Sequence, residues 1–426
     1  MNISELYSIF CKYPNIQIDS RKVKKDDIFF ALKGPNFNGN LFALKALQVG
    51  AAYAVTDEGI KTHDERIIKV DDALSTLQAL AKYHREQFNI PFIAITGSNG
   101  KTTTKELLSS VLASYYKTYT TQGNLNNHIG VPLTLLSIKK DAEMAVIEMG
   151  ANHQKEIESY CSYTLPTHGI ITNCGKAHLE GFGGTEGVKK GKGELFDFIR
   201  NNNGYVFLNT DYKYLQEMSK GIQNIYTYGS NEGALTGTVK MSEPFLEVQI
   251  TKGTSFQELN THLVGEYNLA NALCAVAVGK FFKVPDEKIK AAIENYIPSN
   301  SRSQMVEKGS NKIIMDAYNA NPSSMKAAIE NFAKLGATNK VLMLGGMMEL
   351  GKESLKEHAT IVELIKQYQW NHVVLVGGDY NKIKHSFTYF DNAEQAREWF
   401  LQQHFKNMHL LVKGSRSMQM ERVMED

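Results

Sequence analysis

Apolar runs alternate with amphipathic helical segments along most of the chain. The first stretch contains two short strand-like runs, DDIFFALKG at 26–34 and AAYAVTD at 51–57, and ends in an amphipathic helix, LSTLQALAKYHREQF, at 74–88. After a short linker, FIAIT at 92–96 has the β-branched, apolar pattern of a buried strand, which enters a glycine loop and a helical pattern, KELLSSVLASYY, at 105–116. This order of strand, loop and helix is typical of a nucleotide-binding unit.

The strand-like runs that follow predict a mainly parallel sheet covered by helices. They are AVIEMG (145–150), GIITN (169–173), GYVFLN (204–209) and NIYTYG (224–229). A helical pair at 268–282 and 286–296 closes this part of the chain. From Pro298 the alternation resumes, with strand-like runs at KIIMDAY (312–318), KVLMLGG (340–346), HVVLVGG (372–378) and MHLLVKG (408–414).

These patterns predict an α/β protein of three domains. We expect a first domain at 1–88, a central parallel-sheet ATPase domain with the phosphate loop at 89–298, and a Rossmann-like α/β domain at 299–426. In the last of these, each strand ends in Gly or polar residues before a helix. Sites in open α/β sheets lie at that end of the strands.

Composition excludes several classes of protein. The 426 residues carry 47 Lys plus Arg against 45 Asp plus Glu, so no overall field favours a nucleic acid or an anionic membrane as partner. Nowhere do about 18 apolar residues follow one another, and the first residues lack the pattern of a secretory signal. The four cysteines are scattered without metal-site spacing. We therefore expect a cytoplasmic protein without membrane insertion.

The glycine loop after 92–96 is the strongest chemical signal. Its residues are Gly97, Ser98, Asn99, Gly100, Lys101, Thr102 and Thr103. Two glycines allow consecutive backbone N–H groups to curl around phosphate oxygens, Lys101 supplies charge toward the β- and γ-phosphates, and Thr102 offers a hydroxyl to Mg2+. Only two residues separate the glycines, which differs from the commonest phosphate loop. The alternative is a Gly-rich turn before a helix, which the preceding strand and the Lys-Thr pair disfavour.

A magnesium ion on the phosphates needs further oxygen ligands from a neighbouring strand end. Glu148, at the end of the apolar run 145–150, is the best candidate, although a solvated loop carboxylate is an equally good interpretation of this residue alone. His178 likewise follows a predicted strand in a Gly-rich loop. A lone histidine is more often a structural hydrogen-bonding residue than a ligand.

Taken together, these segments resemble the Mur ligases of peptidoglycan synthesis, and most closely the branch that adds D-alanyl-D-alanine. The resemblance runs over nearly the whole chain. Its motifs are IDSRKVKKDDIFFALKGPNFNGNLF, ITGSNGKTTTKE, QGNLNNHIGVPLTLL, EMGANHQKEI, TNCGKAHLEGFG, GKGELF, GEYNLANAL, SRSQ, MDAYNANPSSM and KGSRSMQMERV. Ligases of this family phosphorylate a substrate carboxylate with ATP and let an amine displace the phosphate.

The resemblance implies two Mg2+ ions beside the phosphates of ATP. Lys101 would stabilise charge on the transferring phosphoryl group, Thr102 and Glu148 would hold one ion, and His178 the other. Lys192 in GKGELF matches the lysine that the family carbamylates with CO2, which turns an ammonium into a carboxylate-like metal ligand. Without the resemblance, Lys192 and its neighbouring lysines would be a solvated basic face of a helix.

Further residues match the nucleotide site of the family. Asn271 corresponds to the amide that hydrogen-bonds adenine, and an Asn inside an apolar helix needs partners in any case. Arg302 corresponds to an arginine that reaches phosphate from the domain junction, with an ordinary linker arginine as the alternative. Asp316 would lie toward the nucleotide. Tyr318, Asn319 and Asn321 fall in a loop that, by resemblance, contacts ATP and the incoming dipeptide, while Asn321 also has the pattern of a helix cap.

The first domain carries the other substrate in the family. Ser20 and Arg21 resemble residues that hold the uridine nucleotide. Asn38 and Gly39 fall in the matching turn, where a purely turn-forming role is at least as plausible. The segment NLNNHIGVPLTLL, which includes Asn126 and Asn127, resembles the dipeptide-adding branch and places both among the expected substrate-binding residues.

The resemblance implies UDP-N-acetylmuramoyl-tripeptide and D-alanyl-D-alanine as substrates of a monomer. The branch that adds a diamino acid to the dipeptide is the second possibility, but its usual DNPR-type motif does not occur in this chain. A phosphate-loop ATPase that uses ATP for conformational work is the alternative from a different class. It would need the loop but not His178, Lys192 or the loop after Asp316.

Overall fold

A computed structural model describes residues 1–299 and 301–425. The chain divides into two compact units. The first comprises Met1–Ala94, Lys117–Gly150 and Glu156–His168, and the second comprises Ile95–Tyr116, Ala151–Lys155 and the chain from Gly169 onward. Because the chain crosses several times between them, each unit is assembled from separate segments of sequence.

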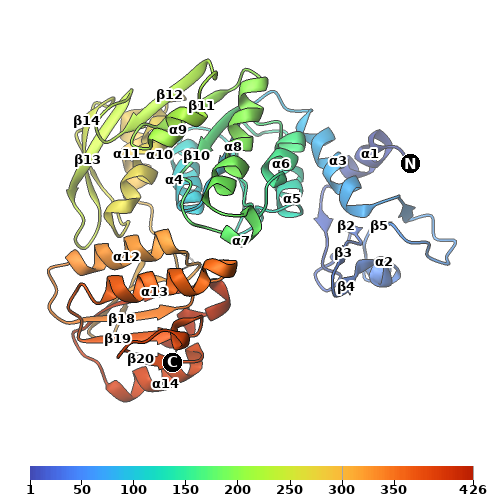
Figure 1. Cartoon of the computed structure of the whole chain (residues 1–426). Helices are drawn as coiled ribbons and strands as arrows, with labels where there is room; N and C mark the ends of the chain where they lie inside the picture. Colours follow the sequence, from blue (N-terminus) through green and yellow to red (C-terminus); the bar gives the residue numbers. More distant parts are fainter. Residues whose placement is uncertain (300, 426) are drawn as a thin grey trace. The chain divides into compact units, whose positions relative to one another are not determined.

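The first unit begins with a small parallel sheet whose strands are short and apolar. Its order is β1 (Ile16–Gln17), β2 (Ile28–Phe30), β5 (Tyr53–Thr56) and β6 (Ile67–Lys69). Helices α1 (Ile3–Lys12) and α2 (Ala43–Gln48) and the two-stranded ribbon of β3 (Lys33–Gly34) and β4 (Phe37–Asn38) accompany it (Figure 1). All three residues of β2 are buried, and Phe29 lies in a core with small residues of α2.

Helix α3 (Ala73–Arg85) connects this sheet to the rest of the first unit. It begins at the cap residue Asp72 and contacts α5 (Gly130–Leu136) and α6 (Glu156–Thr164). At its end, the buried Arg85 donates hydrogen bonds to the backbone oxygens of residues 88, 164 and 165. Parallel strands β8 (Thr118–Thr120) and β9 (Met144–Glu148) complete the unit. The predicted helix at 74–88 is therefore present and ends three residues early.

The second unit contains the nucleotide-binding order of elements. Strand β7 (Phe92–Thr96) enters the unit at its carboxyl end and leads into α4 (Lys101–Ala113). The neighbouring strands are, in spatial order, β10 (His168–Ile171), β11 (Tyr205–Asn209), β12 (Asn224–Gly229), β13 (Leu235–Met241), β14 (Glu247–Lys252) and β15 (Glu258–Asn260). Helices α7 (Leu179–Phe182), α8 (Thr185–Asn201), α9 (Lys213–Met218), α10 (Leu269–Phe281) and α11 (Asp286–Glu294) accompany them.

The sheet is only partly parallel. Strands β11 and β12 pair in parallel, as predicted. Strand β13, which was not predicted, pairs in parallel with β12, and β13, β14 and β15 form an antiparallel meander. The strand-like runs identified in this part of the sequence end at Gly229 and so missed the meander, although β14 alternates apolar and polar residues as a half-buried strand does. Short turns between such strands favour antiparallel pairing.

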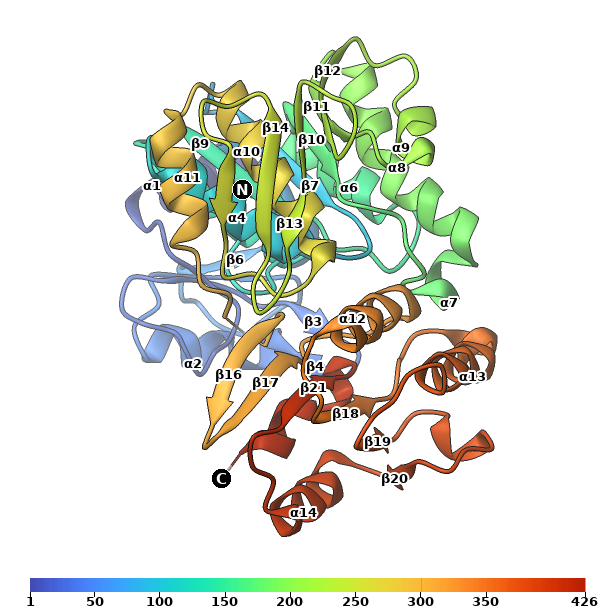
Figure 2. The same ribbon diagram turned by 90° about the vertical axis from the view of Figure 1, so that its left-hand side faces the viewer.

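The last part of the second unit is a six-stranded sheet between helices. Its order is β16 (Gln304–Lys308), β17 (Asn311–Asp316), β21 (His409–Lys413), β18 (Lys340–Gly345), β19 (His372–Val376) and β20 (Thr388–Phe390). Helices α12 (Pro322–Lys334) and α13 (Ser354–Ile365) cover one face, and α14 (Ala393–Gln403) covers the other (Figure 1). All pairs are parallel except the edge hairpin of β16 and β17, which Figure 2 shows from a second direction.

No helix within residues 1–299 and 301–425 has the length and apolar composition needed to span a bilayer. The four cysteines are free thiols.

Candidate active site

The loop between β7 and α4 requires glycine at both of its glycine positions. Gly97 has a φ of +143° and Gly100 a φ of +79°. A Cβ atom on Gly97 would lie 2.0 Å from the hydroxyl oxygen of Thr172, and one on Gly100 would lie 2.6 Å from Oδ1 of Asn271. Because both backbone conformation and space exclude a side chain, the two glycines fix the path of the loop.

Residues after β10 hold this loop in place. Backbone N–H groups of Ser98 and Asn99 donate to Asn173, at 2.8 Å to its backbone oxygen and 3.0 Å to its Oδ1. In return, the hydroxyl of Thr172 and the amide of Asn173 donate to the carbonyl oxygen of Asn99, at 2.6 and 3.1 Å. Sequence reasoning missed Thr172 and Asn173, although their place directly after a buried strand is a signal for such a role.

Lys101 and Thr102 start α4 immediately after the loop. The first four N–H groups of any α-helix have no acceptor within the helix, and its dipole makes this end positive, so α4 presents an anion-binding end to the loop. The Lys101 ammonium folds over the loop and donates to the carbonyl oxygen of Gly97 at 2.7 Å. The Thr102 side chain is buried, and Thr103 lies in the same first turn. This geometry suits the phosphates of a nucleotide.

Asn271 lies on α10 against the same loop. It is buried, its Oδ1 accepts from the hydroxyl of Thr104 at 3.0 Å, and its Nδ2 donates to Oδ1 of Asn268 at 2.8 Å. The partners that an amide inside an apolar helix requires are therefore present. Contact with Gly100 gives Asn271 a second role, the support of the loop, which the sequence did not indicate.

Arg302 and Asp316 lie close together at the start of the six-stranded sheet. The Arg302 guanidinium stacks on the ring of Tyr318 at 3.5 Å from its centroid. Asp316 ends β17, and its carboxylate accepts from the N–H of Ser303 at 3.1 Å and from the ammonium of Lys413 at 2.6 Å. The three sequence-predicted residues are thus brought together, and Lys413 was missed as their neighbour.

The loop after Asp316 ends in a helix cap. Asn321 caps α12 by accepting from the N–H of Ser324 at 3.0 Å, which confirms the cap predicted from the sequence. The Nδ2 group of Asn321 also donates to Oδ1 of Asn99 in the phosphate loop at 2.7 Å. Asn319 accepts from the N–H of Ala320 at 2.9 Å through its own Oδ1.

His178 makes contact with the loop that follows β18. It has a left-handed backbone conformation, and its Nδ1 is hydrogen-bonded to Oε2 of Glu349. This hydrogen bond holds the pKa of the Glu349 carboxyl below its usual range. Two residues before His178, the Lys176 ammonium pairs with the buried carboxylate of Glu357 on α13 at 2.5 Å. Two carboxylates of the part that contains the six-stranded sheet, Glu349 and Glu357, therefore bind the loop around His178.

Lys192 is not on a solvated face of α8. Its side chain is only 1% exposed, its ammonium donates to the carbonyl oxygen of Ala151 at 3.0 Å, and it lies 4.9 Å from the ring centroid of Phe182. The exposed interpretation is therefore wrong for Lys192. It is right for Lys189, whose ammonium pairs with Glu186 at the surface.

In the first unit, Glu148 ends β9 and is 1% exposed, so the interpretation as a solvated carboxylate is wrong. Its Oε1 accepts from Nδ2 of Asn126 at 2.7 Å, and its backbone N–H donates to the hydroxyl of Thr121 at 3.0 Å. Asn127 accepts from the N–H of Gly130 at 2.8 Å and so starts the turn before α5. Asn126 and Glu148 thus form one polar pair, whereas Asn127 has a local structural role.

The sequence-predicted residues near the amino terminus lie in two turns. Arg21 pairs with Asp19 at 2.8 Å, and this arginine lowers the pKa of Asp19 to about 2. Ser20 lies in the same turn. The Oδ1 atom of Asn38 accepts from the N–H of Asn40 at 3.0 Å, and a Cβ on Gly39 would lie 2.6 Å from a backbone oxygen. The turn-forming role of Asn38 and Gly39 is therefore present.

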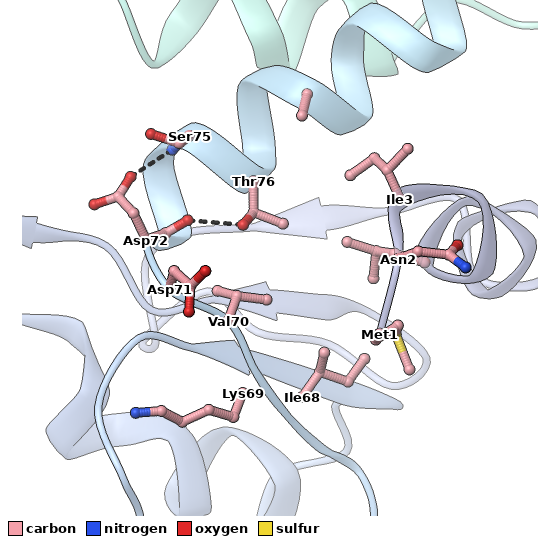
Figure 3. Close-up of a pocket in the computed structure, with 12 residues that line it drawn as sticks. Met1, Asn2, Ile3, Ile68, Lys69, Val70, Asp71, Asp72, Ser75 and Thr76 are labelled. Carbon is pink, nitrogen blue, oxygen red and sulfur yellow. Dashed lines mark hydrogen bonds between the residues drawn. The ribbon is translucent and has the colours of Figure 1, made fainter.

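A pocket of about 610 Å³ opens elsewhere in the first unit. Figure 3 shows that it is lined by the start of the chain, the end of β6 and the first turns of α3. Asp72 at its wall accepts from the N–H of Ser75 at 2.6 Å. None of the sequence-predicted substrate residues lines this pocket.

The described residues, with 300 and 426 set apart, hold no group of three or more His, Cys, Asp or Glu side chains arranged for a metal. A buried strand, a loop with two obligatory glycines and a helix with its positive end at that loop define a phosphate-loop nucleotide-binding protein of the α/β class.

Comparison with known protein families specifies this class further. Three family models match consecutive parts of the chain: "Mur ligase family, catalytic domain" at 12–85, "Mur ligase middle domain" at 95–279 and "Mur ligase, glutamate ligase domain" at 301–416. A ligase of Bacillus subtilis (strain 168), named UDP-N-acetylmuramoyl-tripeptide--D-alanyl-D-alanine ligase, is 31% identical over 96% of this chain and 92% of its own. The chain belongs to the Mur ligase family.

Solved structures agree with this assignment. MurF from Acinetobacter baumannii superposes with a TM-score of 0.88 at 31% identity, covering 96% of this chain and 92% of its own. MurF ligase from Thermotoga maritima in complex with ADP gives a TM-score of 0.87 at 25% identity, covering 96% of both chains. These similarities confirm the predicted α/β fold with its three-domain architecture.

Proposed function

We propose that the chain is an ATP-dependent ligase that joins D-alanyl-D-alanine to UDP-N-acetylmuramoyl-tripeptide through an acyl phosphate. The observation that carries this proposal is the two-glycine loop ahead of α4, in a chain that matches ligases of this name over almost its whole length. In the first step, a carboxylate oxygen of the tripeptide takes the γ-phosphoryl group and ADP leaves. In the second, the amine of the dipeptide attacks the acyl carbon, an amide bond forms and phosphate leaves.

In this proposal, ATP binds the loop from Gly97 to Thr103. The loop supplies backbone N–H groups, and Lys101 is the catalytic residue that stabilises charge on the transferring phosphoryl group. Its ammonium lies at the loop, 2.7 Å from the carbonyl oxygen of Gly97, which supports this role. Asn271 would contact adenine, and Arg302 and Asp316 would contact the nucleotide from the last domain.

Two Mg2+ ions would complete the site. The donor set fits in its chemistry, because Thr102 supplies a hydroxyl and Glu148 a carboxylate, which are the hard oxygen ligands that Mg2+ prefers. His178 would serve the second ion together with Lys192, provided that Lys192 is carbamylated. Burial of Lys192 supports this, since a carbamate would be shielded there from water. Bound metal would neutralise the negative charge of the phosphates and of the carboxylate.

The remaining assignments concern the two other substrates. Ser20, Arg21, Asn38 and Gly39 would hold the uridine nucleotide, and exposure of the Arg21 guanidinium supports a contact with its diphosphate. Further substrate contacts would come from Asn126, Asn127, Tyr318, Asn319 and Asn321. We also propose the domain division 1–88, 89–298 and 299–426, a cytoplasmic location and a monomer.

The reaction is tested by ligation with UDP-N-acetylmuramoyl-tripeptide against a panel of amino acids and dipeptides, with product mass as the readout. We expect a product only with D-alanyl-D-alanine and closely related dipeptides. Release of phosphate should require both substrates. Product from UDP-N-acetylmuramoyl-dipeptide and a diamino acid would instead assign the chain to the branch that adds the third residue, and rapid ATP hydrolysis with neither substrate would contradict a ligase.

A further inference from the structure

The motif KGSR near the end of the chain contains a buried lysine for which the proposed reaction has no role. Lys413 is the last residue of β21, the strand between β17 and β18, and its side chain is 2% exposed. Its ammonium donates to Oδ2 of Asp316 at 2.6 Å and to the carbonyl oxygen of Asn319 at 3.2 Å. A lysine this buried persists only where its charge is compensated, and Asp316 provides the opposite charge.

This ion pair extends into the segment that precedes the sheet. The second oxygen of Asp316, Oδ1, accepts from the N–H of Ser303 at 3.1 Å, and the hydroxyl groups of Ser303 and Tyr267 lie 2.8 Å apart. Ser303 has a left-handed backbone conformation, which is uncommon for a residue with a side chain. Lys413 thus anchors a carboxylate that in turn holds the residue next to Arg302.

Ser415, two residues further on, fastens a second loop to the same strand end. Its hydroxyl accepts from the N–H of Met348 at 2.9 Å and donates to the carbonyl oxygen of Ala320 at 3.4 Å. Its backbone N–H donates to the carbonyl oxygen of Gly346 at 3.2 Å. The end of β21 therefore connects the loop of Asp316 and Asn319 to the loop that leads to Glu349.

We propose that Lys413 is a positioning residue for the ligase reaction, which fixes the Asp316 carboxylate and the backbone of Asn319 and neutralises the charge of Asp316. This inference rests on the proposed function, in which the loop of Asp316 meets ATP and the incoming dipeptide. Without the Lys413 ammonium, no cation would compensate the negative charge of the Asp316 carboxylate, which would lie beside the nucleotide phosphates. The carboxylate would also lose the partner that sets its orientation.

Lys340 provides a matched control. It is likewise a buried lysine of the six-stranded sheet, 7% exposed, at the first position of β18. Its ammonium donates to the carbonyl oxygen of Ala333 at 2.6 Å and, within residues 1–299 and 301–425, makes no hydrogen bond to the loop of Asp316. Replacement of either lysine by methionine removes one buried charge from the sheet, but only Lys413→Met leaves Asp316 without its cation.

The experiment compares the two variants in the full-length protein. Thermal unfolding measures the common cost of losing a buried hydrogen-bonded lysine. Calorimetric titration with ADP then measures nucleotide affinity, and steady-state kinetics give kcat and the KM for D-alanyl-D-alanine. We expect K413M to bind ADP about tenfold more weakly and to have a raised KM for the dipeptide, whereas K340M keeps wild-type values. Unchanged affinity and KM in a folded K413M would overturn the inference.

A double-mutant cycle with Asp316→Asn separates positioning from general destabilisation. Because the proposed effect acts through the carboxylate, Lys413→Met should change ADP affinity little further once Asp316 is Asn. Equal loss of affinity in both backgrounds would show that Lys413 acts independently of Asp316 and would refute the proposal. If K413M does not fold, Lys413→Gln replaces it in the same cycle. Ligation by the wild-type protein is measured first, since its failure concerns the proposed function alone.

Discussion

The side-chain amide of Asn321 donates a hydrogen bond of 2.7 Å to Oδ1 of Asn99, which lies 222 positions earlier in the chain. Asn321 caps α12, and Asn99 is in the middle of the phosphate loop. Asn321 therefore both caps α12, which covers the six-stranded sheet, and contacts the loop that is proposed to bind ATP. The nucleotide site and the start of α12 are structurally linked through this amide.

Asn321→Ala should lower both stability and nucleotide use. Loss of a helix cap costs about 1 kcal/mol of unfolding free energy. The additional loss of the contact with Asn99 leaves the phosphate loop less well held, so we expect a several-fold rise in the KM for ATP. Urea unfolding measures the first effect and steady-state kinetics the second.

Asn392 is the matched control for this variant. It caps α14 by accepting from the N–H of Gln395 at 3.0 Å and, in the part of the chain that the structure describes, makes no hydrogen bond to the phosphate loop. Asn392→Ala should therefore cost a similar unfolding free energy and leave the KM for ATP unchanged. If both variants raised KM equally, the contact between Asn321 and Asn99 would have no specific role in nucleotide use.

These two residues also show what the sequence could and could not predict. The cap at Asn321 follows from local chemistry, because Asn-Pro-Ser-Ser ahead of an apolar helical pattern favours a capped start. Its contact with Asn99 joins distant segments, and no local pattern specifies which loops meet after folding. The phosphate loop was predictable for the same reason as the cap, since strand, loop and helix follow one another within a dozen residues.

Burial was the weakest point of sequence reasoning. Glu148 and Lys192 each have the residue type of a solvated surface group, and both are 1% exposed. The place of Glu148 at the end of an apolar run made it a candidate metal ligand from the pattern alone, whereas only the resemblance to a ligase family drew attention to Lys192. Lys413 shows the converse, because it lay in a matching motif without a role, and only its buried ion pair with Asp316 gives it one.

Gly100→Ala should abolish nucleotide binding. Its φ of +79° costs an alanine roughly 1–2 kcal/mol, and the new Cβ would lie 2.6 Å from Oδ1 of Asn271. Gly309, in the turn between β16 and β17, has a φ of +60° and no atom within 4 Å of an added Cβ. Gly309→Ala should therefore carry the backbone cost alone and bind ADP like the wild type, as calorimetry would show. Equal affinity of both variants would mean that the loop tolerates a side chain.

Lys101→Ala should abolish turnover and leave the fold intact. The ammonium donates to the backbone oxygens of Gly97 and Ser98 in its own loop, and a loop lysine contributes little to core packing. Circular dichroism and thermal unfolding should match the wild type while product formation falls by orders of magnitude. Lys189→Ala, which removes an exposed lysine paired with Glu186, should keep full activity. An unfolded K101A variant would argue against the catalytic assignment.

Glu349→Gln should weaken the affinity of the protein for a divalent metal ion. In the proposed site, Glu349 holds Nδ1 of His178 and leaves Nε2 for the ion, an arrangement whose loss typically costs about tenfold or more in metal affinity. Titration with Mn2+, followed by electron paramagnetic resonance, measures this directly. Glu353→Gln serves as the control. It removes a carboxylate of the same segment, one that pairs with the exposed Lys356. Equal Mn2+ affinity in the wild type, E349Q and E353Q would argue against His178 as a metal ligand.

Acid should destabilise the protein through buried His168 on β10. Burial lowers the pKa of His168 to about 4, from an ordinary value of 6.5. In the unfolded chain this histidine is protonated below pH 6.5, whereas in the native protein it is protonated only below about pH 4. The free energy of unfolding is therefore highest above pH 6.5 and falls as the pH decreases between these two values. At about 1.4 kcal/mol per pKa unit, the loss from this group approaches about 3 kcal/mol.

His168→Gln removes the titrating group, and its unfolding free energy should fall less steeply with decreasing pH than that of the wild type. Urea unfolding at several values between pH 7 and pH 4 measures the difference. His404, an exposed histidine after α14, provides the control, because His404→Gln removes a histidine without removing a buried one. Buried His84 on α3, whose pKa burial also lowers, should preserve part of the acid sensitivity in H168Q. Parallel pH profiles for H168Q and the wild type would show that His168 is protonated as readily in the native protein as in the unfolded chain.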